Sequence, residues 1–125
     1  MLQKLALIAA AGGLGALARY GLAGLVQTAS RGEFPWGTAA VNLLGCFVFG
    51  VLWAAMEDRL SISGEVRTIV LVGFMGSFTT FSTFAFDTVQ MFRDSQWLLM
   101  AGNVALQNVV GVIALLGGLL VGRLV

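Results

Sequence analysis

The chain has 125 residues, of which 58% are hydrophobic and 10% are charged, and its formal net charge is +1. A composition this apolar would leave hydrophobic surface on nearly every side of a soluble monomer, so the sequence indicates a membrane protein. The small net charge, carried by scattered basic residues, gives no indication of a nucleic-acid partner. The chain has no histidine, the commonest metal ligand and general base, and its single cysteine, Cys46, excludes an intrachain disulfide. We therefore expect no enzymatic activity.

Four segments are apolar enough and long enough to cross a bilayer, which takes about 20 residues. They run from Leu2 to Gln27, Trp36 to Met56, Val66 to Phe92 and Trp97 to Leu124, and the short breaks between them hold most of the charge and the turn formers. The first segment has some features of a signal peptide, but its apolar pattern continues without a polar domain behind it. The sequence therefore predicts one all-α domain over residues 1–125 with four transmembrane helices.

Basic residues are distributed almost evenly between the two sides of this predicted bundle. One side has Arg31 and Arg93 and the deeper Arg19, and the other has four residues: Lys4, Arg59, Arg67 and Arg123. The Lys/Arg asymmetry of short loops sets the orientation of a membrane protein. A bias this weak lets the chain insert either way, which permits an antiparallel homodimer.

Glycine is frequent, with 17 residues that include Gly118 and Gly122 at the spacing of a GxxxG motif. Small residues let helices approach closely in lipid, where there is little hydrophobic force between helices. Four helices alone enclose little of a pathway, so we expect a tight oligomer, with a dimer favoured. The alternative is that the glycines only pack helices together within one subunit.

A few polar side chains lie inside the predicted spans. Asn42 is six residues into the second span, where its amide must either bond a neighbouring helix or offer its two N–H donors to a passing solute. Asn103 and Gln107 are four residues apart and share one face of the fourth span. Arg19 and Asp87 lie at similar depths, which allows an ion pair between them.

The third span contains an unusual stretch, "GSFTTFSTF" at residues 76–84, with five hydroxyl side chains. Its composition predicts a broken helix, and irregular backbone at membrane depth is tolerated only where it is buried in protein or lines a watery cavity. A break exposes carbonyl groups that can hold a cation and N–H groups that favour an anion. Phe81 and Phe84 are three residues apart, so either their electropositive ring edges face an anion together or both rings pack in the core.

Three segments resemble the signature segments of the Fluc (CrcB) family of bacterial fluoride channels. They are "GGLGALARY" (12–20), "GTAAVNLLGCFVFG" (37–50) and "GFMGSFTTFSTF" (73–84), and the resemblance covers the whole chain in order. It implies an antiparallel, dual-topology homodimer in the bacterial inner membrane. Such a dimer would have two pathways that export fluoride passively, with strong selectivity over chloride.

The resemblance also implies roles for individual residues of the pathway. Phe81 and Phe84 correspond to the pore-lining phenylalanines, and Asn42 corresponds to the pore asparagine. Ser82 and Thr83 would add hydroxyl groups near the pathway. Fluoride is small and strongly hydrated, so donors of modest strength suit a pore, in which binding must permit both entry and exit.

A structural sodium ion at the dimer centre is implied as well, held by the backbone carbonyls of Gly76 and Thr79. The sequence departs from the family pattern at two positions. Ser77 occupies a place where many relatives have a second glycine, which a carbonyl site should tolerate. Gln107 stands where a serine often lines the pore, so the resemblance does not determine which groups form the outer part of the pathway.

Two other classes of membrane protein remain as alternatives. Small multidrug transporters also have four short spans and dual topology, but they need an acidic residue deep in the first span, and this first span has none. A membrane assembly subunit without transport activity is the second alternative. For that class, mutation of the polar residues would change abundance alone.

Overall fold

The computed structural model describes residues 1–58 and 62–124, so the basic residue predicted at position 59 lies outside the described part. Four helical segments are long and apolar enough to cross a membrane, as predicted. The first is α1 (Leu2–Ser30) and the second is α2 (Trp36–Asp58). The third comprises α3 (Gly64–Thr68), η1 (Ile69–Met75), α4 (Gly76–Phe78) and α5 (Phe81–Arg93), and the fourth comprises α6 (Trp97–Ala105), η2 (Leu106–Val110) and α7 (Gly111–Gly122).

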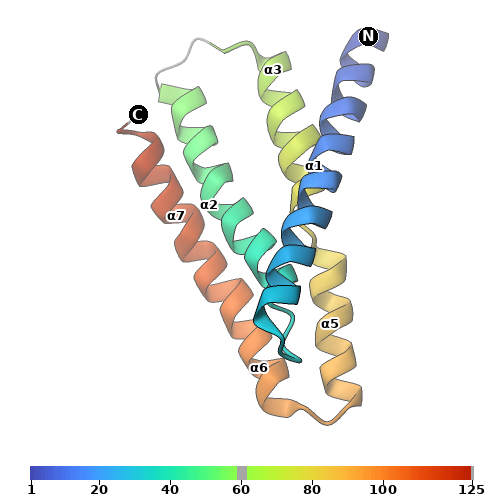
Figure 1. The fold of residues 1–125 in the computed structure, drawn as a ribbon. Coiled ribbons are helices and arrows are strands. Elements are labelled where there is room, and N and C mark those ends of the chain that lie inside the picture. Colours follow the sequence, from blue (N-terminus) through green and yellow to red (C-terminus); the bar gives the residue numbers. More distant parts are fainter. Residues whose placement is uncertain (59–61, 125) are drawn as a thin grey trace.

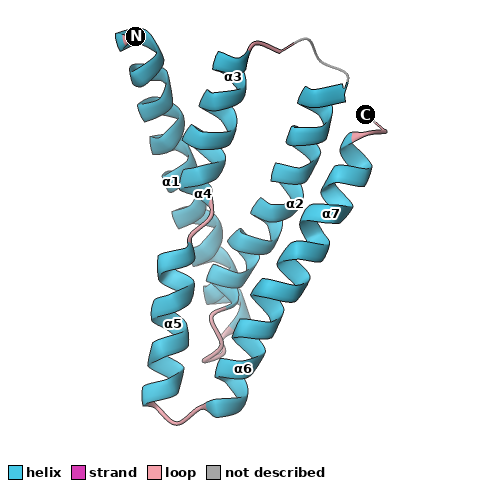
Figure 2. Ribbon diagram, turned by 180° about the vertical axis from the view of Figure 1, so that it is seen from behind, coloured by secondary structure: helices cyan, strands magenta, loops and turns pink. Residues whose placement is uncertain are grey.

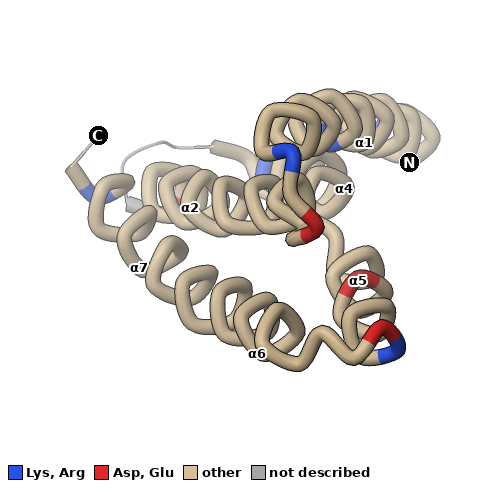
Figure 3. Tube along the Cα trace, turned by 60° about the horizontal axis from the view of Figure 1, so that its bottom comes forward, with Lys and Arg blue, Asp and Glu red and all other residues tan. Residues whose placement is uncertain are grey.

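The four spans alternate in direction, so that the two chain ends lie at the same end of the bundle (Figure 1). The α2 helix packs along α7, α1 packs against α2, η1 and α4, and α5 packs against α6. A buried apolar cluster of Val41, Leu71, Met75 and Phe78 joins α2 to the first half of the third span. Most of the length of the helices carries no charged residue (Figure 3), as expected for a chain that crosses hydrocarbon.

The glycines at the crossing of α2 and α7 bring these two helices into backbone contact. A Cβ atom added at Gly118 would collide with the carbonyl of Phe47, and one at Gly122 would collide with the carbonyl of Val51. Gly118 and Gly122 therefore pack α7 against α2 within one subunit. For this GxxxG pair, the alternative that the glycines pack helices of the same chain is the one that the structure shows. Gly21 of α1, by contrast, has open space where its side chain would be.

The predicted break in the third span lies at Thr79 and Thr80. Both residues have extended backbone, with φ −83° and ψ 158° at Thr79 and φ −147° and ψ 108° at Thr80. The Thr80 hydroxyl caps the next helix by accepting a hydrogen bond from the N–H of Thr83 at 3.3 Å. The change in direction is slight, so the two halves still form a single crossing (Figure 2).

Two π-helical segments, η1 and η2, were not expected from the sequence. In η2 the side-chain NH₂ group of Asn108 donates a hydrogen bond to the backbone carbonyl of Val104, four residues earlier, at 2.8 Å. Short π-helical turns are rare overall, and many of those that occur lie at functional sites. The η2 segment contains Gln107, one of the predicted pathway residues.

Candidate functional site

A pocket of about 220 Å³ opens beside the break in the third span, and we call it the ring pocket. It is formed by α2, the break, the start of α5 and η2. Four of the six residues predicted to line the pathway lie here together: Asn42, Phe81, Phe84 and Gln107. The remaining lining residues are Cys46, Thr79, Thr80 and Asn108. Residues up to 66 positions apart in the sequence thus meet at one depth of the bundle, where the helix is interrupted.

The two phenylalanine rings of this pocket lie against each other at the first turn of α5. Their centroids are 5.5 Å apart and their planes are inclined by 52°. Phe84 is 9% exposed, whereas Phe81 is 77% exposed on this single chain. A tilted pair directs ring edges and faces in different directions, and the edge is the electropositive part of the ring. The pocket therefore offers weakly positive groups without a formal charge.

Asn42 connects α2 to Thr80 in the helix break and to Gln107 in η2. Its Oδ1 accepts the N–H of Thr80 at 2.7 Å, and its Nδ2 donates to the Thr80 carbonyl at 3.0 Å. The same Nδ2 donates to Oε1 of Gln107 at 2.6 Å. Both N–H donors of Asn42 thus have protein acceptors. The helix–helix hydrogen bond considered for this residue is present, and it satisfies backbone groups that the break leaves without helical partners.

The hydrogen bonds continue from Gln107 away from the pocket. Gln107 Nε2 donates to Oδ1 of Asn103 at 2.7 Å, which confirms that these residues share a face. Asn103 is fully buried, and its Nδ2 donates to the Thr88 hydroxyl at 2.9 Å. That hydroxyl donates to the Phe84 carbonyl at 2.7 Å. We call the four side chains of this chain of bonds the amide relay: Asn42, Gln107, Asn103 and Thr88. Thr88 could not be identified from the sequence, because a threonine in an amphipathic helix gives no separate signal.

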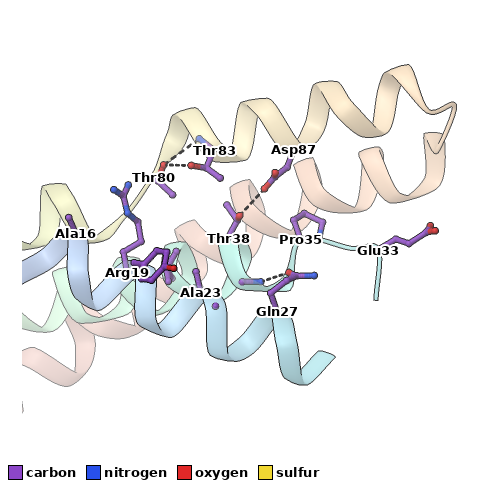
Figure 4. Close-up of a pocket in the computed structure, with 14 residues that line it drawn as sticks. Ala16, Arg19, Ala23, Gln27, Glu33, Pro35, Thr38, Thr80, Thr83 and Asp87 are labelled. Carbon is purple, nitrogen blue, oxygen red and sulfur yellow. Dashed lines mark hydrogen bonds between the residues drawn. The ribbon is translucent and has the colours of Figure 1, made fainter. Parts of the chain in front are cut away.

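A second, wider pocket of about 630 Å³ lies among α1, α2 and α5, and Figure 4 shows its lining. Arg19 and Asp87 both face this pocket, but the two side chains form no ion pair with each other. Asp87 instead accepts a hydrogen bond from the Thr38 hydroxyl at 2.7 Å. Thr80 lines both pockets, so the break separates the wider pocket from the ring pocket.

The other predicted hydroxyl groups are placed differently from the four residues of the ring pocket. Thr83 lines the wider pocket, where its hydroxyl accepts a hydrogen bond from the Thr80 hydroxyl at 2.9 Å. Ser82 is exposed on this chain, with its hydroxyl 3.5 Å from that of Thr80. Gly76 is exposed, and Thr79 lies at the edge of the ring pocket. The structure therefore does not bring Ser82 and Thr83 to the ring pocket.

Comparison with known proteins places this arrangement in a family. The sequence model of the family described as "CrcB-like protein, Camphor Resistance (CrcB)" matches residues 6–119. The chain belongs to the CrcB-like family. The matched part of this CrcB-like chain includes every residue of the ring pocket and of the amide relay.

Several curated relatives of this CrcB-like chain are similar over its full length. A protein of Nitrosococcus oceani is 54% identical over 125 residues, which is 100% of both chains. Proteins of Desulforapulum autotrophicum and Solidesulfovibrio magneticus are 51% and 49% identical, again over 100% of both chains. Each of the three relatives is named "Fluoride-specific ion channel FluC". The relatives are thus described as ion channels, in agreement with the expectation that this chain is not an enzyme.

Proposed function

We propose that this protein is a fluoride-specific ion channel of the bacterial inner membrane, through which fluoride leaves the cell passively. The observation that carries the proposal is the ring pocket, which joins two tilted phenylalanines and three carboxamides at a helix break in the membrane. The full-length similarity to proteins named as fluoride-specific channels supports the same function.

The chemistry of the ring pocket suits a small, strongly hydrated anion. An ion that enters must exchange its water for other donors, which the amides of Asn42 and Gln107 and the ring edges of Phe81 and Phe84 can supply. None of these four groups carries a formal positive charge, so the ion is not trapped. Conduction needs binding that is favourable enough for entry and weak enough for exit.

We propose further that the functional unit is an antiparallel homodimer with two pathways. On a single chain the ring of Phe81 and the hydroxyl-bearing Ser82 are exposed beside a break in the helix. Irregular backbone at membrane depth is not tolerated against lipid, so another protein surface must cover it. A second copy is favoured, because the weak Lys/Arg bias permits both orientations of the same chain.

A structural sodium ion at the centre of that dimer is the finer part of the proposal, and the backbone chemistry fits it. In a continuous helix, the carbonyls of Gly76 and Thr79 would accept the N–H groups of Thr80 and Thr83. Here those N–H groups donate to Asn42 Oδ1 at 2.7 Å and to Thr80 Oγ1 at 3.3 Å. The two carbonyls are thereby left without their usual helical donors. Unwound carbonyls of this kind coordinate sodium in other membrane proteins.

The direct test is fluoride efflux from liposomes that contain the purified protein. We expect rapid fluoride release once valinomycin lets potassium leave as the counterion, and little release of chloride under the same conditions. Protein-free liposomes give the background. Absence of release above that background would reject the channel function and leave the assembly subunit as the better interpretation.

A further inference from the structure

The amide relay has a direction that its two backbone ends determine. It begins at the N–H of Thr80, which can only donate, so the oxygen of the Asn42 carboxamide must face it. Every later side chain is then oriented in turn, up to the Thr88 hydroxyl, which donates to the Phe84 carbonyl at 2.7 Å. In this direction the Oε1 atom of Gln107 faces Asn42 and accepts the N–H of Asn42 Nδ2. That N–H is therefore not free for an ion in the ring pocket. The pocket is therefore poor in free N–H groups.

The last three members of the relay can also be reversed. Gln107, Asn103 and Thr88 each carry a donor and an acceptor, so each can exchange the two roles. The oxygen and the NH₂ group of a carboxamide are similar in size, so Asn103 can turn over even though it is 0% exposed. After reversal, Thr88 would donate to Asn103, Asn103 would donate to Gln107, and the Nε2 of Gln107 would face the pocket.

We propose that an anion entering the ring pocket reverses this relay, and that Asn103 and Thr88 are positioning residues that set how readily the reversal occurs. This inference rests on the proposed channel function. The anion would replace the oxygen of Gln107 as acceptor for Asn42 and would also receive an N–H from Gln107, so that two donors converge on it. Neither Asn103 nor Thr88 lines the pocket, so both act through Gln107.

Two hydrogen bonds inside the protein exist only in the observed direction. On reversal the bond from Asn42 Nδ2 to Gln107 Oε1 is replaced by the bond to the anion, whereas the bond from the Thr88 hydroxyl to the Phe84 carbonyl is released without a replacement. That carbonyl lies inside α5, where the helix itself supplies an N–H donor, so its release leaves no unpaired group. The Thr88 hydroxyl therefore biases the relay toward the donor-poor direction by about one hydrogen bond.

The test uses a pair of substitutions at Thr88. Thr88→Val removes the biasing bond, while Asn103 loses one partner in either direction, so the donor-rich direction becomes easier to reach. We expect fluoride flux per reconstituted dimer, measured well below saturation, to rise by about two- to tenfold, the ratio that one such bond represents. Thr88→Ser keeps the hydroxyl and should restore the wild-type rate. A merely structural role for Thr88 would lower the yield of the valine variant and leave its flux per dimer no higher.

The matched control is Thr68→Val. The Thr68 hydroxyl makes the same type of bond, to the carbonyl of Gly64 four residues earlier at 2.8 Å, but it lies far from the relay. Its flux should equal that of the wild type. A valine variant at position 88 that conducts no faster than the Thr68→Val control overturns the relay proposal.

A double-mutant cycle tests whether Asn103 acts through Gln107. Asn103→Leu removes both relay bonds of this residue and should also raise the flux, whereas in a Gln107→Ser background the same change should have no effect. Equal effects in both backgrounds would contradict the proposal. The wild-type protein separates the two levels of inference: no fluoride release from it rejects the channel function, while normal release with unresponsive variants rejects the relay alone.

Discussion

Substitution of Asn42 by aspartate probes the ring pocket most sharply, because it changes one NH₂ group into an oxygen. The Oδ1 atom that accepts the Thr80 N–H is kept. The new oxygen takes the place of Nδ2, which in the wild type donates to the Thr80 carbonyl at 3.0 Å, so two oxygens face each other in the variant. Gln107 can turn its own NH₂ group toward the aspartate, whereas the Thr80 carbonyl belongs to the backbone and cannot turn. We therefore expect a stability loss of about 1–3 kcal/mol, the cost of one buried polar group without its partner.

The effect of Asn42→Asp on conduction should be much larger than its effect on stability. A fixed negative charge at about 4 Å from a passing anion opposes it by about 4 kcal/mol at an effective dielectric constant of about 20. Each 1.36 kcal/mol is tenfold in rate, so the flux should fall by roughly a thousandfold. Asn42→Ser is the neutral control, in which donors are lost without added charge, and it should lose much less.

The assay is fluoride efflux from liposomes at matched amounts of reconstituted dimer, with thermal unfolding of the same samples to measure stability. Wild-type flux in the aspartate variant would show that the anion does not pass near Asn42. Equal losses in the aspartate and serine variants would show that the ion does not sense the charge. Either result would refute a pathway through the ring pocket.

Four other features of the protein can each be tested by one experiment. Phe81→Ile and Phe84→Ile should each leave a folded dimer but greatly slow fluoride flux. The test is clearest for Phe81, which is 77% exposed on one chain and contributes little to its core. Full flux in both variants would contradict the ring-edge mechanism. Cys46 lines the ring pocket, so a small methanethiosulfonate reagent should slow flux in the wild type and not in Cys46→Ser; equal sensitivity of the two would place the reagent's action elsewhere. Tags on the C-terminus should be accessible from both sides of the membrane in comparable amounts, and accessibility from one side alone would reject the antiparallel dimer. Replacement of sodium by a bulky organic cation should lower the melting temperature of the dimer, whereas an unchanged melting temperature would argue against the carbonyl site at Gly76 and Thr79.

Much of the fold could be predicted from the sequence because the membrane imposes simple rules. Apolar length alone located the four spans to within a few residues at each end. The break at Thr79 and Thr80 was also predictable, since hydroxyl and glycine residues weaken a helix and a threonine is a favoured cap. The convergence of Asn42 with Phe81 and Phe84 followed from the resemblance to the family, and the ring pocket contains all three.

Other features depend on tertiary contacts that leave no signal in a single sequence. The roles of Gly118 and Gly122 were open between two interfaces, because close packing within a chain and between chains requires the same small residues. The π-helical turn at Gln107 has no known composition signature. Both N–H donors of Asn42 bind protein acceptors, and Asp87 accepts a hydrogen bond from Thr38 instead of pairing with Arg19. These bonds depend on side-chain directions that only the packed structure defines.

Fluoride itself should carry charge passively through this protein, and the reversal potential of the fluoride current measures this most directly. With a tenfold fluoride gradient across a membrane containing the purified protein, and equal chloride on both sides, the current should reverse near the fluoride equilibrium potential of about 59 mV. It should remain there when chloride is made unequal. Reversal at zero, or a shift that follows the chloride gradient, would contradict a fluoride-selective channel.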